Sequence, residues 1–193
     1  MKKITLSIVA ALAFGFAANA QKPDVKFGAK AGLNIANLTG SDASTSSITS
    51  FHVGAVAEIF INEKFSVQPE LLYSAQGAES KFDYGFGSQK LKMKLDYINI
   101  PIMAKYYVWE GLNIQAGPQL GFNVKGKIEG EDIKDNVKGF DFGLNFGAGY
   151  ELPVGVFFDA RYNVGLTNTF KKVEGEEIKA KNGVFQISVG YKF

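Results

Sequence analysis

The sequence of 193 residues has no cysteine, a single histidine, five prolines and no apolar run as long as 18 residues. The absence of cysteine excludes a disulfide framework, a thiolate nucleophile and a cysteine-based metal site. One histidine, His52, is too few for a histidine-rich metal site. The lack of a long apolar run excludes a membrane-spanning helix, which needs about 20 such residues. We therefore expect neither a metal ion nor a cofactor.

The N-terminus has the pattern of a secretory signal peptide. Two lysines precede an apolar run over residues 4–16, and Ala18-Asn19-Ala20 then fits the small-x-small cleavage pattern. An uncleaved N-terminal anchor is the alternative, but the run is short for a helix that spans a bilayer. The sequence therefore predicts export of the protein.

We expect cleavage between Ala20 and Gln21, which divides the chain into a signal peptide over 1–20 and one mature domain over 21–193. Without the two lysines of the signal peptide, the remaining lysine and arginine residues balance the 19 aspartate and glutamate residues. A neutral chain has no general electrostatic attraction to nucleic acid, so we expect no nucleic-acid partner.

Apolar and polar residues alternate through almost the whole mature chain. One run reads Phe140, Phe142, Leu144 and Phe146 at alternate positions, with small or polar residues between them. Alternation with a period of two is typical of β-strands. Eight such runs occur, over residues 27–35, 51–61, 65–76, 97–108, 112–124, 140–152, 156–166 and 185–193.

The connections between these runs are alternately short and long. The short connections are 62–64, 109–111 and 153–155, and the long ones are 37–50, 77–94, 126–139 and 167–182. Short turns at one end and long loops at the other are typical of outer-membrane barrels. We expect the short turns and both termini on the periplasmic side, with the long loops outside.

Alternation alone does not decide which face lies inside, because a soluble lipocalin-like barrel has apolar residues in its interior. In this chain the polar positions are mostly Gly, Asn, Gln and Ser, with about one charge per strand, whereas a water-facing sheet is normally rich in Lys and Glu. Aromatic residues also gather towards the ends of the runs, as in interfacial girdles. The sequence therefore predicts an all-β protein, an eight-stranded antiparallel up-and-down transmembrane β-barrel with apolar residues facing lipid.

Four segments carry a resemblance to a known family: LDYINIPIMAKYY, GLNIQAGPQLGF, FDFGLNFGAGYEL and FFDARYNVGLTN. They resemble the PorT-like outer-membrane β-barrel proteins, often labelled "porin family", over about Val25 to Phe193. The chain ends with Tyr191-Lys192-Phe193, which resembles the C-terminal signal read by the barrel assembly machinery. The resemblance implies the fold and an outer-membrane location, but it implies neither a pore nor a role in secretion.

Motifs for catalysis are scarce. His52 is followed by Val53 and Gly54, so there is no local His-x-Ser pair of the kind expected in a lipid-modifying hydrolase, and no Gly-x-Ser-x-Gly elbow occurs. We expect His52 to be a lumen or rim residue and the chain to have no catalytic residues. The acidic segment 129–135 lacks the spacing of an EF-hand loop. Lysines at 90, 92, 94, 171 and 172 either contact anionic lipopolysaccharide head groups or are simply solvated.

The polar face of the predicted strands collects five cations and five anions: Lys26, Lys30, Lys105, Arg161 and Lys192 with Glu58, Glu70, Asp141, Glu151 and Asp159. Counting residues along the strands brings five of them to similar heights: Arg161, Glu70, Glu58, Asp159 and Lys30. We therefore expect a structural ion network in the middle of the lumen, arranged around the planar fork of the single arginine. The alternative is that each charge reaches lumen water separately.

The expected function is a structural or ligand-binding role through the long loops, with the lumen largely plugged, because eight strands enclose a space that side chains can fill. A small-solute pore is the alternative, and a lipid-modifying envelope enzyme is a third. Expected partners are outer-membrane lipids, the barrel assembly machinery during biogenesis and an unidentified extracellular ligand. We expect a monomer.

Overall fold

The structure is a computed structural model that describes residues 24–40, 45–83, 88–171 and 179–193. The predicted signal peptide and its cleavage point between Ala20 and Gln21 lie outside the described residues. Within the described part of the chain, no helix has the length and hydropathy needed to span a membrane.

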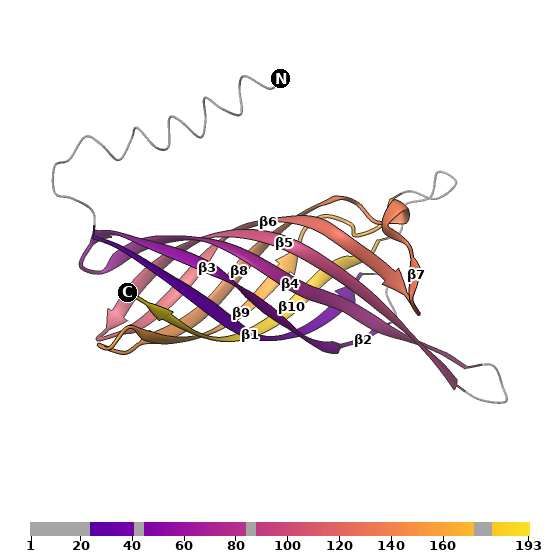
Figure 1. The fold of residues 1–193 in the computed structure, drawn as a ribbon, viewed down its shortest axis with the longest axis horizontal. Helices are drawn as coiled ribbons and strands as arrows, with labels where there is room; N and C mark the ends of the chain where they lie inside the picture. Colours follow the sequence, from indigo (N-terminus) through magenta and orange to yellow (C-terminus); the bar gives the residue numbers. More distant parts are fainter. Residues whose placement is uncertain (1–23, 41–44, 84–87, 172–178) are drawn as a thin grey trace, which may run out of the picture.

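Eight long strands form a closed antiparallel barrel (Figure 1), which confirms the predicted fold class. Each long strand pairs with the next long strand in the sequence, and β1 also pairs with β10, with Gly28 opposite Lys192 and Leu38 opposite Asn182. The long strands are β1 (Val25–Thr39), β3 (Ile48–Asn62), β4 (Phe65–Asp83), β5 (Ser88–Trp109), β6 (Leu112–Ile128), β8 (Phe140–Glu151), β9 (Val156–Gly165) and β10 (Lys181–Lys192).

Three short elements lie in the long connections. The two-residue strand β2 (Thr45–Ser46) pairs with β4, and the two-residue strand β7 (Glu131–Asp132) pairs with β6. A single 3-10 turn, η1 (Lys134–Asn136), follows β7. The described parts of the connections are therefore folded against the barrel.

The two ends of the barrel differ. The short connections 63–64, 110–111 and 152–155, the start of β1 and the C-terminus lie together at one end, here called the turn end (Figure 1). Local chemistry fixes these turns: the Asn62 side-chain oxygen accepts hydrogen bonds from the backbone N–H groups of Lys64 (3.0 Å) and Phe65 (2.9 Å). Gly111 and Gly155 take positive φ angles of 76° and 87°, which favour glycine. The opposite end is called the loop end.

One predicted loop is largely strand. The segment 77–94 was expected to be a long loop, but β4 continues to Asp83 and β5 begins at Ser88, so the two strands form a hairpin that projects beyond the barrel (Figure 1). Its sequence alternates as Lys-Leu-Lys-Met-Lys-Leu over 90–95. The prediction was wrong because a long polar connection is typical of a loop, whereas the lysines of this segment occupy alternate positions of a strand.

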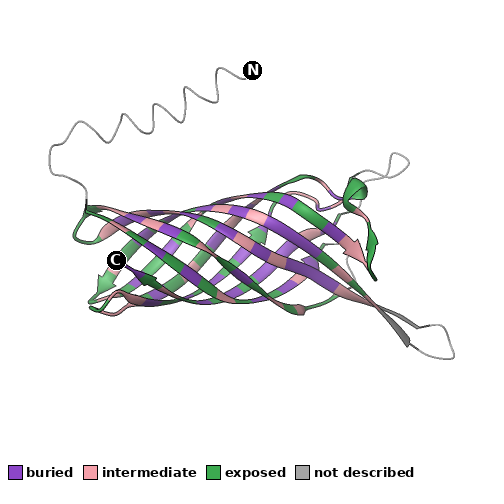
Figure 2. Ribbon diagram, viewed as in Figure 1, coloured by how far each residue is buried: buried purple, intermediate pink, exposed green. Residues whose placement is uncertain are grey.

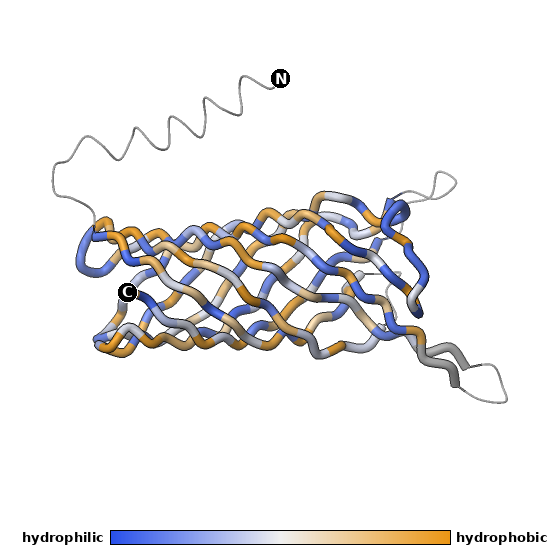
Figure 3. Tube along the Cα trace, in the orientation of Figure 1, coloured by the Kyte–Doolittle hydropathy of each residue, from blue (hydrophilic) through white to orange (hydrophobic). Residues whose placement is uncertain are grey.

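The barrel wall has mostly apolar residues outside and mostly polar residues inside. Burial and hydropathy accordingly alternate along the strands (Figures 2 and 3). Outward residues such as Leu33 (57% exposed), Phe146 (51%) and Ile187 (52%) alternate with buried polar residues such as Asn34, Asn145 and Gln186. A soluble barrel would have the opposite arrangement. A surface of this kind is stable only against lipid, and a closed barrel leaves no unpaired strand edge in the membrane.

Candidate functional site

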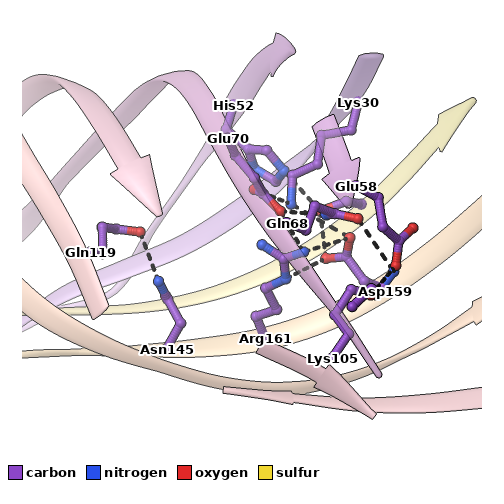
Figure 4. Close-up of polar contacts among 12 residues, drawn as sticks. Lys30, His52, Glu58, Gln68, Glu70, Lys105, Gln119, Asn145, Asp159 and Arg161 are labelled. Atoms are coloured by element: carbon purple, nitrogen blue, oxygen red, sulfur yellow. Dashed lines mark hydrogen bonds and ion pairs between the residues drawn. The ribbon is translucent and has the colours of Figure 1, made fainter. Parts of the chain in front are cut away.

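Four charged residues meet in the middle of the lumen: Lys30 of β1, Glu70 of β4, and Asp159 and Arg161 of β9. All four are at most 5% exposed. The Arg161 guanidinium contacts Glu70 Oε1 through one terminal nitrogen (2.8 Å) and Asp159 Oδ1 through Nε (3.2 Å). Lys30 Nζ contacts Glu70 Oε2 (3.2 Å) and Asp159 Oδ2 (3.4 Å), so each cation contacts both carboxylates. We call this group the mid-lumen cluster (Figure 4).

The mid-lumen cluster is electrically neutral and has further hydrogen bonds. Gln68 donates to Glu70 Oε1 (2.7 Å), and the Ser188 hydroxyl donates to Asp159 Oδ1 (3.0 Å). Buried charges are tolerated when they are paired and hydrogen-bonded, and the planar arginine fork can contact two carboxylates at once. These contacts join β1, β4, β9 and β10 across the interior.

Glu58 was expected in the same network but lies in a second group towards the turn end. It forms ion pairs with Lys105 (3.0 Å) and Lys192, and Lys192 also contacts Glu151 (2.6 Å). Tyr107 donates its hydroxyl hydrogen bond to Glu58 (2.7 Å) or Glu151 (3.1 Å). The members of this turn-end cluster are Lys26, Glu58, Lys105, Tyr107, Glu151 and Lys192.

The stagger of the strands explains the different position of Glu58. In the β1–β3 pairing, Glu58 lies opposite Lys26, whereas Lys30 lies opposite Gly54. Counting residues from the end of each strand ignores this shear and therefore misjudges height. Gln68 connects the two groups, because it contacts Glu70 and also accepts a hydrogen bond from Lys105 (3.3 Å).

His52 lies inside the barrel and is fully buried. Its Nδ1 is 2.8 Å from the side-chain oxygen of Asn34, and its Nε2 is 2.9 Å from the Ser188 hydroxyl. Asn34 also contacts Ser74 and the backbone carbonyl of Ala75. The Ser188 hydroxyl also contacts Asp159. His52, Asn34 and Ser74 therefore extend the polar network from the mid-lumen cluster towards the loop end.

The interior changes character at the loop end. Leu95, Tyr97 and Val137 are at most 2% exposed and form an apolar cluster, against which Met93, Ile133 and Phe170 pack. Backbone contacts hold the covering segments together: Lys138 N–H donates to the Thr169 carbonyl (2.8 Å). We call this group of apolar side chains the loop-end cap.

A cavity of about 1080 Å³ opens at the turn end. Its lining includes Lys26, Tyr107, Glu151 and Lys192, so the turn-end cluster forms its inner boundary. Among the described residues, no group of three or more His, Cys, Asp or Glu side chains is placed to hold a metal ion.

The proposed assembly residues lie on the outer surface of the barrel. Tyr191 and Phe193 are 52% and 79% exposed, and the Phe193 N–H donates to the Phe27 carbonyl (2.8 Å). The final residue therefore lies at the seam between β1 and β10, at the turn end.

Residues 19–171 match the sequence pattern of the outer membrane protein beta-barrel domain family. The chain belongs to this family. It is an outer-membrane protein, and the apolar outer wall of the barrel fits a location in a lipid bilayer. No curated protein sequence matches the chain.

Solved structures of outer-membrane barrels are similar in fold. Neisserial surface protein A (NspA) has a TM-score of 0.60 at 17% identity, over 88% of this chain and 99% of that chain. The Ail protein of Yersinia pestis has a TM-score of 0.47 at 14% identity, over 88% and 99% of the two chains. Outer membrane protein W of E. coli has a TM-score of 0.45 at 17% identity, over 90% and 100%. At its identity, the likeness to NspA shows the fold alone.

The sequence did not single out several residues that complete the lumen network. Gln68, Tyr107 and Ser188 are uncharged, so a search for opposite charges passes over them. All three occupy inward positions of their strands. The alternation of the strands could therefore have predicted that they lie in the lumen. Asn34 likewise contacts His52 from an inward position.

Proposed function

We propose that this outer-membrane protein is a closed barrel that acts through its loop end and does not conduct solutes. The observation that carries the proposal is the mid-lumen cluster, in which Arg161 and Lys30, both 2% exposed, each contact two carboxylates. A solute crossing at this level would have to separate buried ion pairs, which is strongly unfavourable. The loop-end cap adds a second obstruction.

In this proposal the loop end faces the cell exterior and the turn end faces the periplasm. The alternation of short and long connections supports this orientation. The loops then have a structural role or bind an extracellular ligand that is still to be identified, and the barrel works as a monomer.

A small-solute pore is the second candidate, and the cavity of about 1080 Å³ at the turn end favours it. An enzymatic role is less favoured, although Ser188 lies 2.9 Å from His52. Both residues are buried, and the Ser188 hydroxyl also contacts Asp159, so it is poorly placed to attack a substrate.

Conductance across a planar lipid bilayer separates the closed barrel from the pore. The mature protein, reconstituted in the folded form, should give no stable channel in salt solution. A matched Arg161→Ala sample should give discrete openings, because the mid-lumen cluster loses its bridging cation. Stable single-channel conductance of the unaltered protein would overturn the proposal, whereas silence of both proteins would assign the closure to the loop-end cap.

We also propose that the protein is PorT-like, is cleaved after Ala20, and is recognised by the barrel assembly machinery through its C-terminal residues. The Phe193→Ala variant should then accumulate several-fold less heat-modifiable, folded barrel in the outer membrane. Phe185→Ala is the matched control, since Phe185 is also an exposed aromatic residue of β10 but lies far from the C-terminus. Equal losses for the two variants would remove Phe193 from a special role. The intact mass of the purified protein tests whether it begins at Gln21.

A further inference from the structure

The outer wall of β5 and β6 changes from apolar to basic just above the lipid-facing belt. A β-bulge marks the change: Asn123 pairs with Tyr97 and Lys125 pairs with Asp96, so Val124 is an extra residue in β6. Bulges of this kind redirect the side chains that follow them. If the alternation of β6 continued through Val124 without a bulge, Gly126 would face outward and Lys125 would face inward.

The bulge turns Lys125 and Lys127 of β6 to the same outward face as Lys92 and Lys94 of β5. Cross-strand partners share a face, so Lys125 faces out beside Asp96, and Lys127 faces out beside Lys94. Lys92 lies two residues closer to the loop end in β5. Lys92, Lys94 and Lys125 are exposed and Lys127 is partly exposed. We call Lys92, Lys94, Lys125 and Lys127 the lysine ladder.

The lysine ladder is only partly neutralised by the protein itself. Lys125 lies 3.5 Å from Asp96, but within the described part of the chain Lys94 and Lys127 form no ion pair. Like charges directly opposite each other on two strands are destabilising. The arrangement of Lys94 and Lys127 therefore favours an anion that binds between them.

The carboxylates of Glu129 and Asp132, near the edge of the lysine ladder that is closest to the loop end, accept hydrogen bonds from backbone N–H groups. Glu129 accepts a hydrogen bond from the backbone N–H of Lys92 (2.7 Å). Asp132 of β7 lies opposite Lys127, but its carboxylate accepts a hydrogen bond from the backbone N–H of Lys134 (2.8 Å). Glu79 lies opposite Lys92 at the same edge. Among the residues that the structure describes, Asp96 is the carboxylate beside Lys125, on the side of the ladder that adjoins the apolar belt.

The height of the lysine ladder matches the lipid head groups. Phe122 and Tyr73, on the outward face next to the bulge, belong to the aromatic girdle at the loop end. Each further pair of residues adds about 7 Å along a strand, or roughly 5 Å along the membrane normal at the usual strand tilt. The Lys125 and Lys127 levels then lie roughly 5–10 Å beyond the girdle, within the head-group layer.

We propose that the lysine ladder binds the phosphate groups of an anionic glycolipid in the outer leaflet. The apolar belt holds the acyl chains directly below, and the ammonium groups supply charge-assisted hydrogen bonds to phosphate above. The proposal rests on the orientation given under the proposed function, with the loop end facing the exterior.

Native mass spectrometry of the folded full-length mature protein in a neutral detergent tests the proposal. The probe is diphosphorylated lipid A, and the comparison lipid is the same molecule without its phosphates. The barrel should bind the phosphorylated lipid, and the double variant Lys94→Gln/Lys127→Gln should bind it on the order of tenfold more weakly. The control double variant Lys134→Gln/Lys171→Gln removes two exposed lysines from the loop end outside the ladder and should bind within about twofold of the unaltered protein.

A stability measurement guards against a folding defect. In lipid-free detergent the ladder variant should be at least as stable as the unaltered protein, because it loses a like-charge pair. Added lipid A should raise the melting temperature of the unaltered protein more than that of the ladder variant. Equal binding of the dephosphorylated lipid, or equal weakening in the control variant, would overturn the proposal. These in vitro results do not depend on orientation in the cell, so surface labelling of cells tests the proposed orientation separately.

Discussion

Within one strand, β5, the membrane-embedded part and the loop-end extension have opposite polarity. In the membrane-embedded part the inward face carries Asn99 and Lys105, with Pro101 and Met103 between them, while outward residues such as Ile102 are apolar. Beyond the bulge the inward residues are Leu95 and Met93, while Lys94 faces out. The backbone and its period of two are the same in both parts, so the surrounding medium decides which face is apolar.

The comparison also separates two ways to fill a narrow lumen. In the middle, paired charges fill the space and join three strands, whereas at the loop end Leu95, Tyr97 and Val137 exclude water by ordinary apolar packing. An ion pair stabilises the barrel through the attraction between its two members, so removal of one member leaves the other as an unpaired buried charge. An apolar contact contributes through area and volume, so its loss leaves a cavity.

Cysteine labelling should distinguish the two ends with an all-or-none result. The sequence has no cysteine, so Lys171→Cys at the loop end and Lys64→Cys at the turn end each create a unique thiol. Both positions are exposed. A membrane-impermeant maleimide should label Lys171→Cys on intact cells and Lys64→Cys only after the outer membrane is permeabilised. The reverse pattern would invert the orientation.

Arg161→Ala should cause the largest loss of stability in the lumen. Its removal leaves Glu70 and Asp159 with only Lys30 between them, so the free energy of unfolding should fall by about 3–5 kcal/mol. Denaturant titration of the barrel in detergent micelles measures this change. The double variant Arg161→Ala/Glu70→Ala, which restores neutrality, should recover part of the loss. Unchanged stability, together with unchanged bilayer conductance, would show that the ions do not act as a unit.

Leu95→Ala should have a smaller effect, about 2–3 kcal/mol, because it removes apolar contacts but no charge. The same denaturant titration measures it. The lumen should remain closed to ions, since the mid-lumen cluster is untouched. Leu33→Ala, at a lipid-facing position that is 57% exposed, serves as the control and should lose less. A leaky Leu95→Ala barrel would assign the closure to the loop-end cap.

Lys26→Gln should have the smallest effect, below about 1 kcal/mol. Lys26 contacts Glu151 at 3.2 Å, but its side chain is 39% exposed and water can replace the contact. The matched change Lys30→Gln removes a fully buried ammonium from the mid-lumen cluster and should be several-fold more destabilising. Similar effects of the two variants would mean that burial does not govern the strength of these pairs.

The fold could be predicted almost completely because apolar and polar residues alternate along each strand of a barrel wall. Runs such as 140–152 and the short turn at 110–111 need no long-range information. The prediction for 77–94 was wrong because Lys92 and Lys94 face outward there, which reverses the polarity that identifies the other strands. The reversal depends on where the membrane ends, and a period of two does not give that height.

Side-chain partners were harder to predict than the faces on which they lie. Alternation assigns Glu58 and Glu70 to the lumen correctly, but it does not fix the stagger between neighbouring strands. A slip of one residue pair moves a charge by about 7 Å, more than the length of an ion pair. The contacts of Glu58 with Lys105 and Lys192 are consequently visible only in the structure.

The pairing of β1 with β10 has a consequence for synthesis of the protein. The hydrogen bond between Gln186 and Asn34 joins residues 152 positions apart, so the ring cannot form until nearly all of the chain has left the ribosome. Before that moment β1 has one unpaired edge, which is prone to wrong pairing with other chains. A chain truncated before β10 would keep seven long strands and two open edges. The unpaired backbone N–H and C=O groups of these edges would face lipid, which is strongly unfavourable. Closure of the barrel therefore depends on the pairing of β10 with β1, which is the last pairing that can form as the chain is made.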